Sequence, residues 1–222
     1  MNVIEALENR QSIRAFLDKD VELDKIKKIL NAASYAPSGV NTQPWQVAVL
    51  SGSKKQELQQ AMEKSFRKGK QGKMDYQYYP SEWEDPYRTR RKECGLLMYS
   101  TLRISREDKE KQINQWAANY RAFDAPVMLL FFMDSKLEIG SFLDYGMFLQ
   151  SIMLAAVAEG LATCPQAALG EYPEIVKDLL GYDRNMKLIC GIALGYADKT
   201  ALINSYRTSR ENINTFTNFF VD

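Results

Sequence analysis

Two arginines four residues apart flank a serine near the start of the chain, in Arg10-Gln11-Ser12-Ile13-Arg14. A guanidinium group is permanently charged and can donate two parallel hydrogen bonds to a phosphate, and the serine hydroxyl adds a neutral donor. This segment is therefore a candidate phosphate site at the end of a predicted first helix. The alternative is an ordinary charged helix end that binds no ligand.

A second candidate is the loop Ala36-Pro37-Ser38-Gly39-Val40-Asn41-Thr42-Gln43-Pro44-Trp45. Two prolines restrict its backbone, and four polar side chains lie within it. A rigid loop of this kind just before a strand can present hydrogen-bond donors to a flat ligand. A plain connection between a helix and a strand is the competing interpretation.

The third candidate is Thr163-Cys164-Pro165-Gln166-Ala167-Ala168, where small side chains after the proline let backbone N–H groups approach a planar ring. Generic nucleotide-binding patterns are missing, since the sequence has neither G-x-G-x-x-G after a strand nor G-x-x-x-x-G-K-[ST]. The lysine-rich stretch 68–73 has the wrong spacing for a phosphate loop and indicates a solvated basic loop.

Composition excludes several kinds of chemistry. The 222 residues include no histidine, which removes Ser-His-Asp and Cys-His catalysis and the zinc sites that need imidazole. Cys94, Cys164 and Cys190 are odd in number and form no C-x-x-C pair, so we expect small buried thiols, no disulfide framework and no metal site. With a net charge of +1, the chain lacks the excess of positive charge that is typical of nucleic-acid-binding proteins, and there is no reason to propose a membrane partner.

The start of the chain is charged and helical in pattern, without the apolar region of a signal peptide. The longest apolar stretch, 142–161, contains Asp144, Gln150 and Glu159, which would make a membrane span costly. We therefore expect a cytoplasmic protein in which this stretch is a buried helix.

Hydrophobic periodicity predicts a mixed α/β order in which helices dominate. The expected helices cover 3–8, 24–33, a segment capped by Ser53, 142–160 and 173–180. The expected strands cover 46–50, 127–133 and 188–196, with a short strand or loop at 162–168. The helix at 142–160 is apolar nearly all round, and such a helix is often shared with a second subunit.

Residues 67–123 differ in character from the rest because they are rich in lysine, arginine, tyrosine and tryptophan. After an irregular basic loop, two helices are predicted near 87–102 and 107–122. We expect one domain over 1–222, with this segment as an elaboration that covers an active site. A solvated surface excursion is the alternative.

These segments together resemble the nitroreductase family. Arg10 to Arg14 is similar to the family's R-R-S-x-R flavin-phosphate motif, and 36–45 is similar to its A-P-S-x-x-N-x-Q-P-W signature. Thr163 to Ala168 sits where members place the loop that faces flavin N5, and a late arginine, Arg210, follows the last predicted strand. The resemblance spans nearly the whole chain, is weakest over 67–123, and is closest to the branch that acts on nitrobenzoates and nitrobenzenes.

The resemblance implies a central, mostly antiparallel sheet flanked by helices, in an intertwined homodimer. It also implies bound FMN, reduced by NADH or NADPH and reoxidised by a nitroaromatic or related acceptor in a ping-pong reaction. No catalytic side chain is implied, because the Ala167 and Ala168 backbone N–H groups would face flavin N5 and O4. The cofactor-binding residues would be Arg10, Gln11, Ser12, Arg14, Pro37, Ser38, Gly39, Asn41, Asn119, Pro165, Gln166, Ala167, Ala168 and Arg210, of which Ser38 and Asn41 would reach across from the partner subunit. Arg121 is a looser candidate beside Asn119.

Three alternatives stay open at this point. A flavin enzyme of the same kind could act on quinones, enones or halogenated aromatics, a flavin-holding protein could lack turnover, and an interaction domain would hold no cofactor. One departure from the family pattern is Gln11, which stands where arginine or histidine is common. A neutral contact at that position predicts lower FMN affinity.

Overall fold

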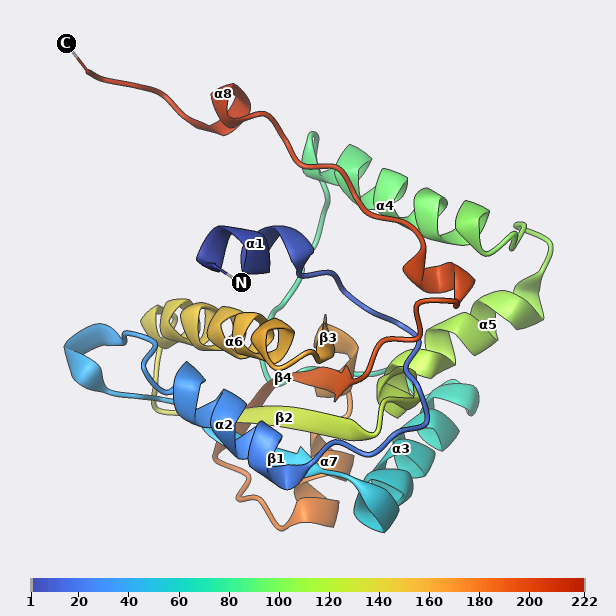
Figure 1. Cartoon of the computed structure of the whole chain (residues 1–222). Helices are drawn as coiled ribbons and strands as arrows, with labels where there is room; N and C mark the ends of the chain where they lie inside the picture. The colour runs from blue at the N-terminus through green and yellow to red at the C-terminus, as the bar shows by residue number, and fades with distance from the viewer. Residues whose placement is uncertain (1, 222) are drawn as a thin grey trace.

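The structure is a computed structural model that describes residues 2–221. Its longer elements follow the sequence patterns, and four short 3-10 turns (η1–η4) join them (Figure 1). The helices are α1 (Val3–Asn9), α2 (Leu23–Ala33), α3 (Gly52–Arg67), α4 (Tyr87–Thr101), α5 (Lys109–Ala117), α6 (Gly140–Ala158), α7 (Pro173–Leu180) and α8 (Ile213–Phe216). The strands are β1 (Gln46–Leu50), β2 (Val127–Asp134), β3 (Ala162–Gln166) and β4 (Met186–Gly195).

The four strands form one sheet in the order β1-β2-β4-β3, and all three strand pairs are antiparallel. The central strands β2 and β4 are buried along nearly their whole length, as continuous apolar runs predict. The expected mostly antiparallel sheet flanked by helices is thus confirmed.

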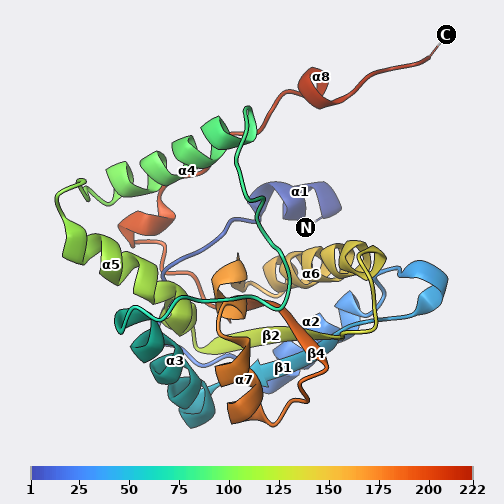
Figure 2. The same ribbon diagram turned by 180° about the vertical axis from the view of Figure 1, so that it is seen from behind.

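Helices cover both faces of this sheet (Figures 1 and 2). Because side chains alternate along a strand, Leu129 and Phe131 pack in one core with α2 and α6, whereas Leu130 and Phe132 pack in a second core with α3 and α7. The two cores hold the sheet rigid, and the candidate site segments lie along its edges and ends.

Most predicted boundaries hold within two residues, and three differ for identifiable reasons. The helix α3 begins at Gly52 with Ser51 at the N-cap, so the expectation for Ser53 was wrong. The helix predicted to reach residue 122 ends at Ala117, because Ala122 and Phe123 adopt positive φ angles of 52° and 53° within η2 (Ala118–Asp124). The segment after β3 turns into η3 (Ala167–Gly170).

The long apolar helix α6 contacts α2, α1 and β3. By length and composition α6 could cross a membrane. About one third of its most apolar 18-residue stretch is buried within the chain. It is therefore less buried than expected for a core helix of a single chain. Ile139, at its N-cap, and Leu143 are 85% and 73% exposed.

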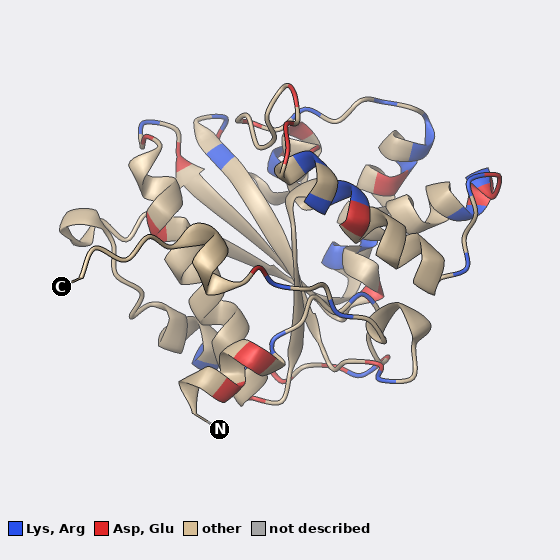
Figure 3. Cartoon of the chain, turned by 90° about the horizontal axis from the view of Figure 1, so that it is seen from above, with Lys and Arg blue, Asp and Glu red and all other residues tan. Residues whose placement is uncertain are grey.

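Two parts of the chain extend away from this body. The helix α4 has no buried residue, and it lies beside the segment that follows η4 (Leu202–Asn204), where Arg90 pairs with Glu211 at 2.9 Å. Beyond that pair, the C-terminal arm (residues 212–221) leaves the body, as Figures 1 and 2 show. The arm has no charged residue and is therefore tan in Figure 3. Its aromatic residues Phe216, Phe219 and Phe220 are exposed.

Candidate functional site

The arginine segment 10–14 runs as extended chain from the end of α1 to the edge strand β3. Asn9 is the last residue of α1, and the backbone N–H of Ile13 donates to the Thr163 carbonyl at 3.0 Å. A parallel bridge between Ser12 and Thr163 continues this pairing. The first and third sequence candidates are therefore neighbours in space.

A segment from the far end of the chain lies against the arginine segment. The Gln11 side-chain amide donates to the carbonyls of Asn204 and Tyr206, at 3.1 and 2.8 Å. The Arg14 backbone N–H donates to the Asn204 side chain at 2.8 Å. The Gln11 side-chain nitrogen thus joins the two segments.

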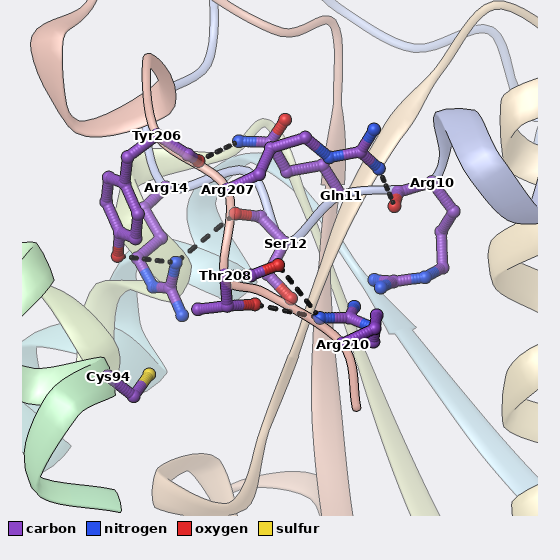
Figure 4. A pocket seen from close by; sticks show the side chains of 9 residues that line it. All are labelled: Arg10, Gln11, Ser12, Arg14, Cys94, Tyr206, Arg207, Thr208 and Arg210. Atoms are coloured by element: carbon purple, nitrogen blue, oxygen red, sulfur yellow. Dashed lines mark hydrogen bonds between the residues drawn. The ribbon is translucent and has the colours of Figure 1, made fainter. Parts of the chain in front are cut away.

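These two segments and α4 enclose the first pocket, of about 210 Å³, which we call the arginine pocket (Figure 4). None of its lining residues is acidic, and four are arginines. The lining residues are Arg10, Gln11, Ser12, Arg14, Cys94, Tyr206, Arg207, Thr208 and Arg210. Burial, together with the positive charges of Arg210 and Arg207, lowers the pKa of the Arg10 guanidinium. An unbalanced cluster of this kind can bind a compact, multiply charged anion.

The arginines differ in how far protein groups hold them. Arg207 donates to the Arg10 carbonyl at 2.9 Å, Arg14 to the Tyr206 hydroxyl at 3.3 Å, and Arg210 to the Thr208 hydroxyl at 2.9 Å. The Arg10 guanidinium has no hydrogen bond to another described residue, and it points into the pocket (Figure 4). Three arginines are therefore pre-positioned, and Arg10 is free to engage a ligand.

Sequence reasoning missed four residues of this pocket. Arg207 had a weak signal, since it lies three residues before Arg210 in the same segment. Tyr206, Thr208 and Cys94 had none. The expectation that all three cysteines are buried was wrong for Cys94, which is exposed on α4. Burial raises the pKa of Cys164 to about 11 and that of Cys190 to about 12, so both remain thiols at neutral pH.

A second pocket lies at the C-terminal end of β3 and has no charged residue in its lining. It is lined by Tyr76, Tyr78, Phe142, Tyr145, Gly146, Leu149, Pro165, Gln166, Ala167, Ile189 and Cys190. We call it the aromatic pocket. Gln166 donates to the Asn119 carbonyl at 3.0 Å, but its own side-chain oxygen is buried without a partner, as is the Thr163 hydroxyl. Buried polar atoms normally have partners, so this region has capacity to bind a polar, flat ligand.

The proline loop 36–45 is distant from the first pocket within one chain, whereas it contacts the first half of α6, which also contributes to the lining of the aromatic pocket. The backbone N–H of Gly39 donates to Asp144 in the second turn of α6, at 3.1 Å, whereas the first pocket adjoins β3 after the other end of that helix. From Asp144 to Ala158 the helix rises about 20 Å. Pro37, Ser38, Gly39 and Asn41 therefore do not meet Arg10 to Arg14 in a single chain.

The tip of the proline loop is strained. Val40 has a φ of 44° and is 97% exposed, and Asn41 and Gln43 also have positive φ angles. A β-branched residue in this region is a conformational outlier, and such strain concentrates at functional sites.

We expect Val40→Gly to raise the thermal midpoint of unfolding by about 2–4 °C. Removing the strain should contribute about 1–3 kcal/mol, partly offset by about 0.5–1 kcal/mol of added chain entropy. Val49→Gly, in an extended strand, is the matched control and should lower the midpoint. Thermal unfolding of both variants followed by circular dichroism measures this. A lower midpoint for Val40→Gly would contradict the strain.

The segment 67–123 reaches both pockets. Tyr76 and Tyr78 line the aromatic pocket, and Cys94 lines the arginine pocket. Its arginines lie elsewhere: Arg90 pairs with Glu211, and Arg121 pairs with Glu63 and Asp124 at 3.0 and 2.9 Å. Arg121 is thus held in an ion-pair network away from both pockets.

The chain is similar to known proteins over nearly its full length. The model of the Nitroreductase family matches residues 7–196. A 4-nitrobenzoate reductase from Pseudomonas putida is 37% identical over 95% of this chain and 92% of its own. A chloronitrobenzene nitroreductase from Comamonas testosteroni is 36% identical over 96% and 94%. The crystal structure of the FMN-dependent nitroreductase NfnB from Mycobacterium smegmatis, in complex with NADPH, superposes with a TM-score of 0.92 at 32% identity and covers 98% and 99% of the two chains.

Proposed function

We propose, starting from the fact that this chain belongs to the nitroreductase family, that it is an FMN-dependent oxidoreductase that reduces nitroaromatic compounds with NAD(P)H. When bound, FMN would supply the two-electron redox chemistry that links NAD(P)H to the acceptor. The protein supplies binding, orientation and electrostatics. This division of roles explains how a chain without histidine can be an enzyme.

The arginine pocket is the observation that carries the proposal. Four guanidinium groups and the Ser12 hydroxyl form a donor set suited to a phosphate dianion, and no acidic residue of the lining competes. The lowered pKa of Arg10 reflects burial and like charges that such an anion would offset. Arg10, Ser12, Arg14, Arg207 and Arg210 would hold the FMN phosphate.

The neighbouring aromatic pocket suits the flavin ring and a flat substrate. Pro165, Gln166 and Ala167 belong to its lining, and Ala168 and Asn119 lie directly beside them. Backbone N–H groups of Ala167 and Ala168 would face the polar edge of the ring, and the unpartnered Gln166 oxygen would accept a hydrogen bond there. The apolar side chains around them exclude water, which strengthens these polar contacts.

The separation of the proline loop from the arginine pocket supports a homodimer. If two α6 helices pack antiparallel about a two-fold axis, the Asp144 end of one meets the Ala158 end of the other. Pro37, Ser38, Gly39 and Asn41 of each chain would then complete the site of its partner. The exposed Ile139 and Leu143 on α6 and the uncharged C-terminal arm are the surfaces that the partner would cover.

We also propose that the enzyme works in the cytoplasm. Cys94, Cys164 and Cys190 are all free thiols, and free thiols persist in a reducing compartment.

The test is an anaerobic stopped-flow experiment on the purified protein. We expect about one released FMN per chain, bleaching of the flavin by NAD(P)H, and reoxidation by nitrobenzene. The aromatic pocket has no cationic residue in its lining, so nitrobenzene should be favoured over 4-nitrobenzoate in kcat/KM. Reoxidation only by quinones, enones or halogenated aromatics would reassign the substrate, and a flavin that NAD(P)H cannot bleach would exclude an enzyme of this class.

A further inference from the structure

The side chains of Asp75 and Tyr76 bind the edge of β4 beyond the point where its neighbour ends. The strand β3 pairs with residues 191–195 of β4 only. The Asp75 carboxylate accepts the Leu188 backbone N–H at 2.8 Å, and the Tyr76 hydroxyl donates to the Ile189 carbonyl at 2.7 Å. Two adjacent side chains thus satisfy backbone groups that another strand would otherwise pair.

Asp75 is fixed by a second, charged contact. The Lys177 ammonium lies 2.8 Å from its carboxylate, and the exposed fractions of the two side chains are 3% for Lys177 and 18% for Asp75. Lys177 belongs to α7, which is packed in the core on the far side of the sheet from α6. A buried ion pair of this kind adds little net stability, but it fixes the relative positions of the segments that carry it.

Tyr76 is the residue through which this anchor meets the aromatic pocket. Its ring lies 4.8 Å from the ring of Phe142 on α6 and 6.2 Å from that of Tyr78, and all three line the pocket. Burial raises the pKa of Tyr76 well above its ordinary value, so its hydroxyl remains a donor to Ile189 at neutral pH.

We infer that Asp75, held by Lys177, is a positioning residue that keeps Tyr76 in place as a wall of the substrate pocket. The inference rests on the proposed function, because it assigns the aromatic pocket to the flat acceptor. It explains why a charged pair is buried beneath an otherwise irregular loop. Without the Asp75–Lys177 ion pair, the 70–79 loop loses the contact that orients Tyr76.

The test removes both charges together, in Asp75→Ala with Lys177→Met, so that no buried charge is left unpaired. Nitrobenzene is titrated into the oxidised holoenzyme without a reductant, and its dissociation constant is read from the change in flavin absorbance. We expect binding about tenfold weaker than in the wild type, the effect of losing one aromatic contact, with unchanged FMN content.

The decisive comparison repeats the double substitution in a Tyr76→Ala background. If Asp75 acts through Tyr76, removing the pair should have no further effect on the dissociation constant there. Equal weakening in both backgrounds, or no weakening in either, would overturn the inference. The matched control is Asp178→Ala with Arg184→Met, which removes an exposed ion pair involving the same helix and should leave nitrobenzene binding unchanged.

Two further arms keep the result interpretable. Should the double variant not fold, Asp75→Asn with Lys177→Met carries the same comparison, because it removes both charges and keeps a side-chain oxygen that can accept the Leu188 N–H. Turnover with NAD(P)H is measured separately on the wild type. If the effect of the double substitution on nitrobenzene binding depends on Tyr76 but the wild type shows no turnover, the proposed function is refuted and the inference is retained. If the wild type turns over but the effects of the double substitution and of Tyr76→Ala are additive, the inference is refuted and the proposed function is retained.

Discussion

Arg10→Ala is expected to weaken FMN binding by about tenfold to hundredfold while leaving the apoprotein at least as stable as the wild type. Hydrogen bonds to a charged group contribute about 1.5–3 kcal/mol, which corresponds to that range of affinity. The apoprotein should not lose stability, because the Arg10 guanidinium has no hydrogen bond to a described residue and lies close to Arg207 and Arg210. Removing one of several like charges relieves repulsion.

The measurements are a fluorescence titration of each apoprotein with FMN and a thermal unfolding curve without it. Arg207→Ala is the contrasting variant, since its guanidinium donates to the carbonyls of Glu8 and Arg10. It should lose both affinity and stability. Arg10→Lys keeps the charge but loses the bidentate geometry, and should be intermediate. If Arg10→Ala binds FMN with wild-type affinity, the arginine pocket is not the phosphate site of the cofactor.

The second large effect is expected from Leu143→Glu on α6. Leu143 is 73% exposed in the single chain, and the proposed dimer buries it. Taking a carboxylate into an apolar interface costs several kcal/mol, so the dimer dissociation constant should rise by at least about a hundredfold. Because Ser38 and Asn41 would complete the partner's site, FMN should be lost together with the dimer.

Light scattering over a dilution series, with flavin absorbance recorded on each fraction, measures both quantities at once. Leu143→Met preserves apolar character and approximate volume, and should remain a yellow dimer. A Leu143→Glu protein that is monomeric yet binds FMN as tightly as the wild type would refute the shared site. A dimer unaffected by the charge would place the interface away from this face of α6.

The sequence was sufficient where one residue type determines the local structure. Helix α7 begins at Pro173 and ends before Gly181, which takes a left-handed φ of 71°, and both limits follow from the known preferences of proline and glycine. The strand β1 was predicted to the residue. Arg10 and Arg14 could be nominated because only a few side chains bind phosphate, and Arg210 because of the family resemblance. Nothing local shows that residues about 200 positions apart form one pocket.

The remainder depends on tertiary contacts that leave no local signal. That the Gln11 amide nitrogen donates to the carbonyls of Asn204 and Tyr206 could not be predicted, because only the folded chain brings these residues near one another. Cys94 lies on a helix without a buried face, so no periodicity shows what it faces. The positive φ angles at Ala122 and Phe123 override helix-compatible side chains for the same reason.

The arginine pocket joins segments about 200 residues apart, with Gln11 bridging to Tyr206. Translation runs from the N-terminus, so Arg10, Ser12 and Arg14 are synthesised long before Arg207 and Arg210. The pocket cannot form until residue 210 has left the ribosome. If the pocket holds the FMN phosphate as proposed, a nascent chain shorter than this would lack the complete phosphate site, and FMN would bind tightly only after that point in synthesis.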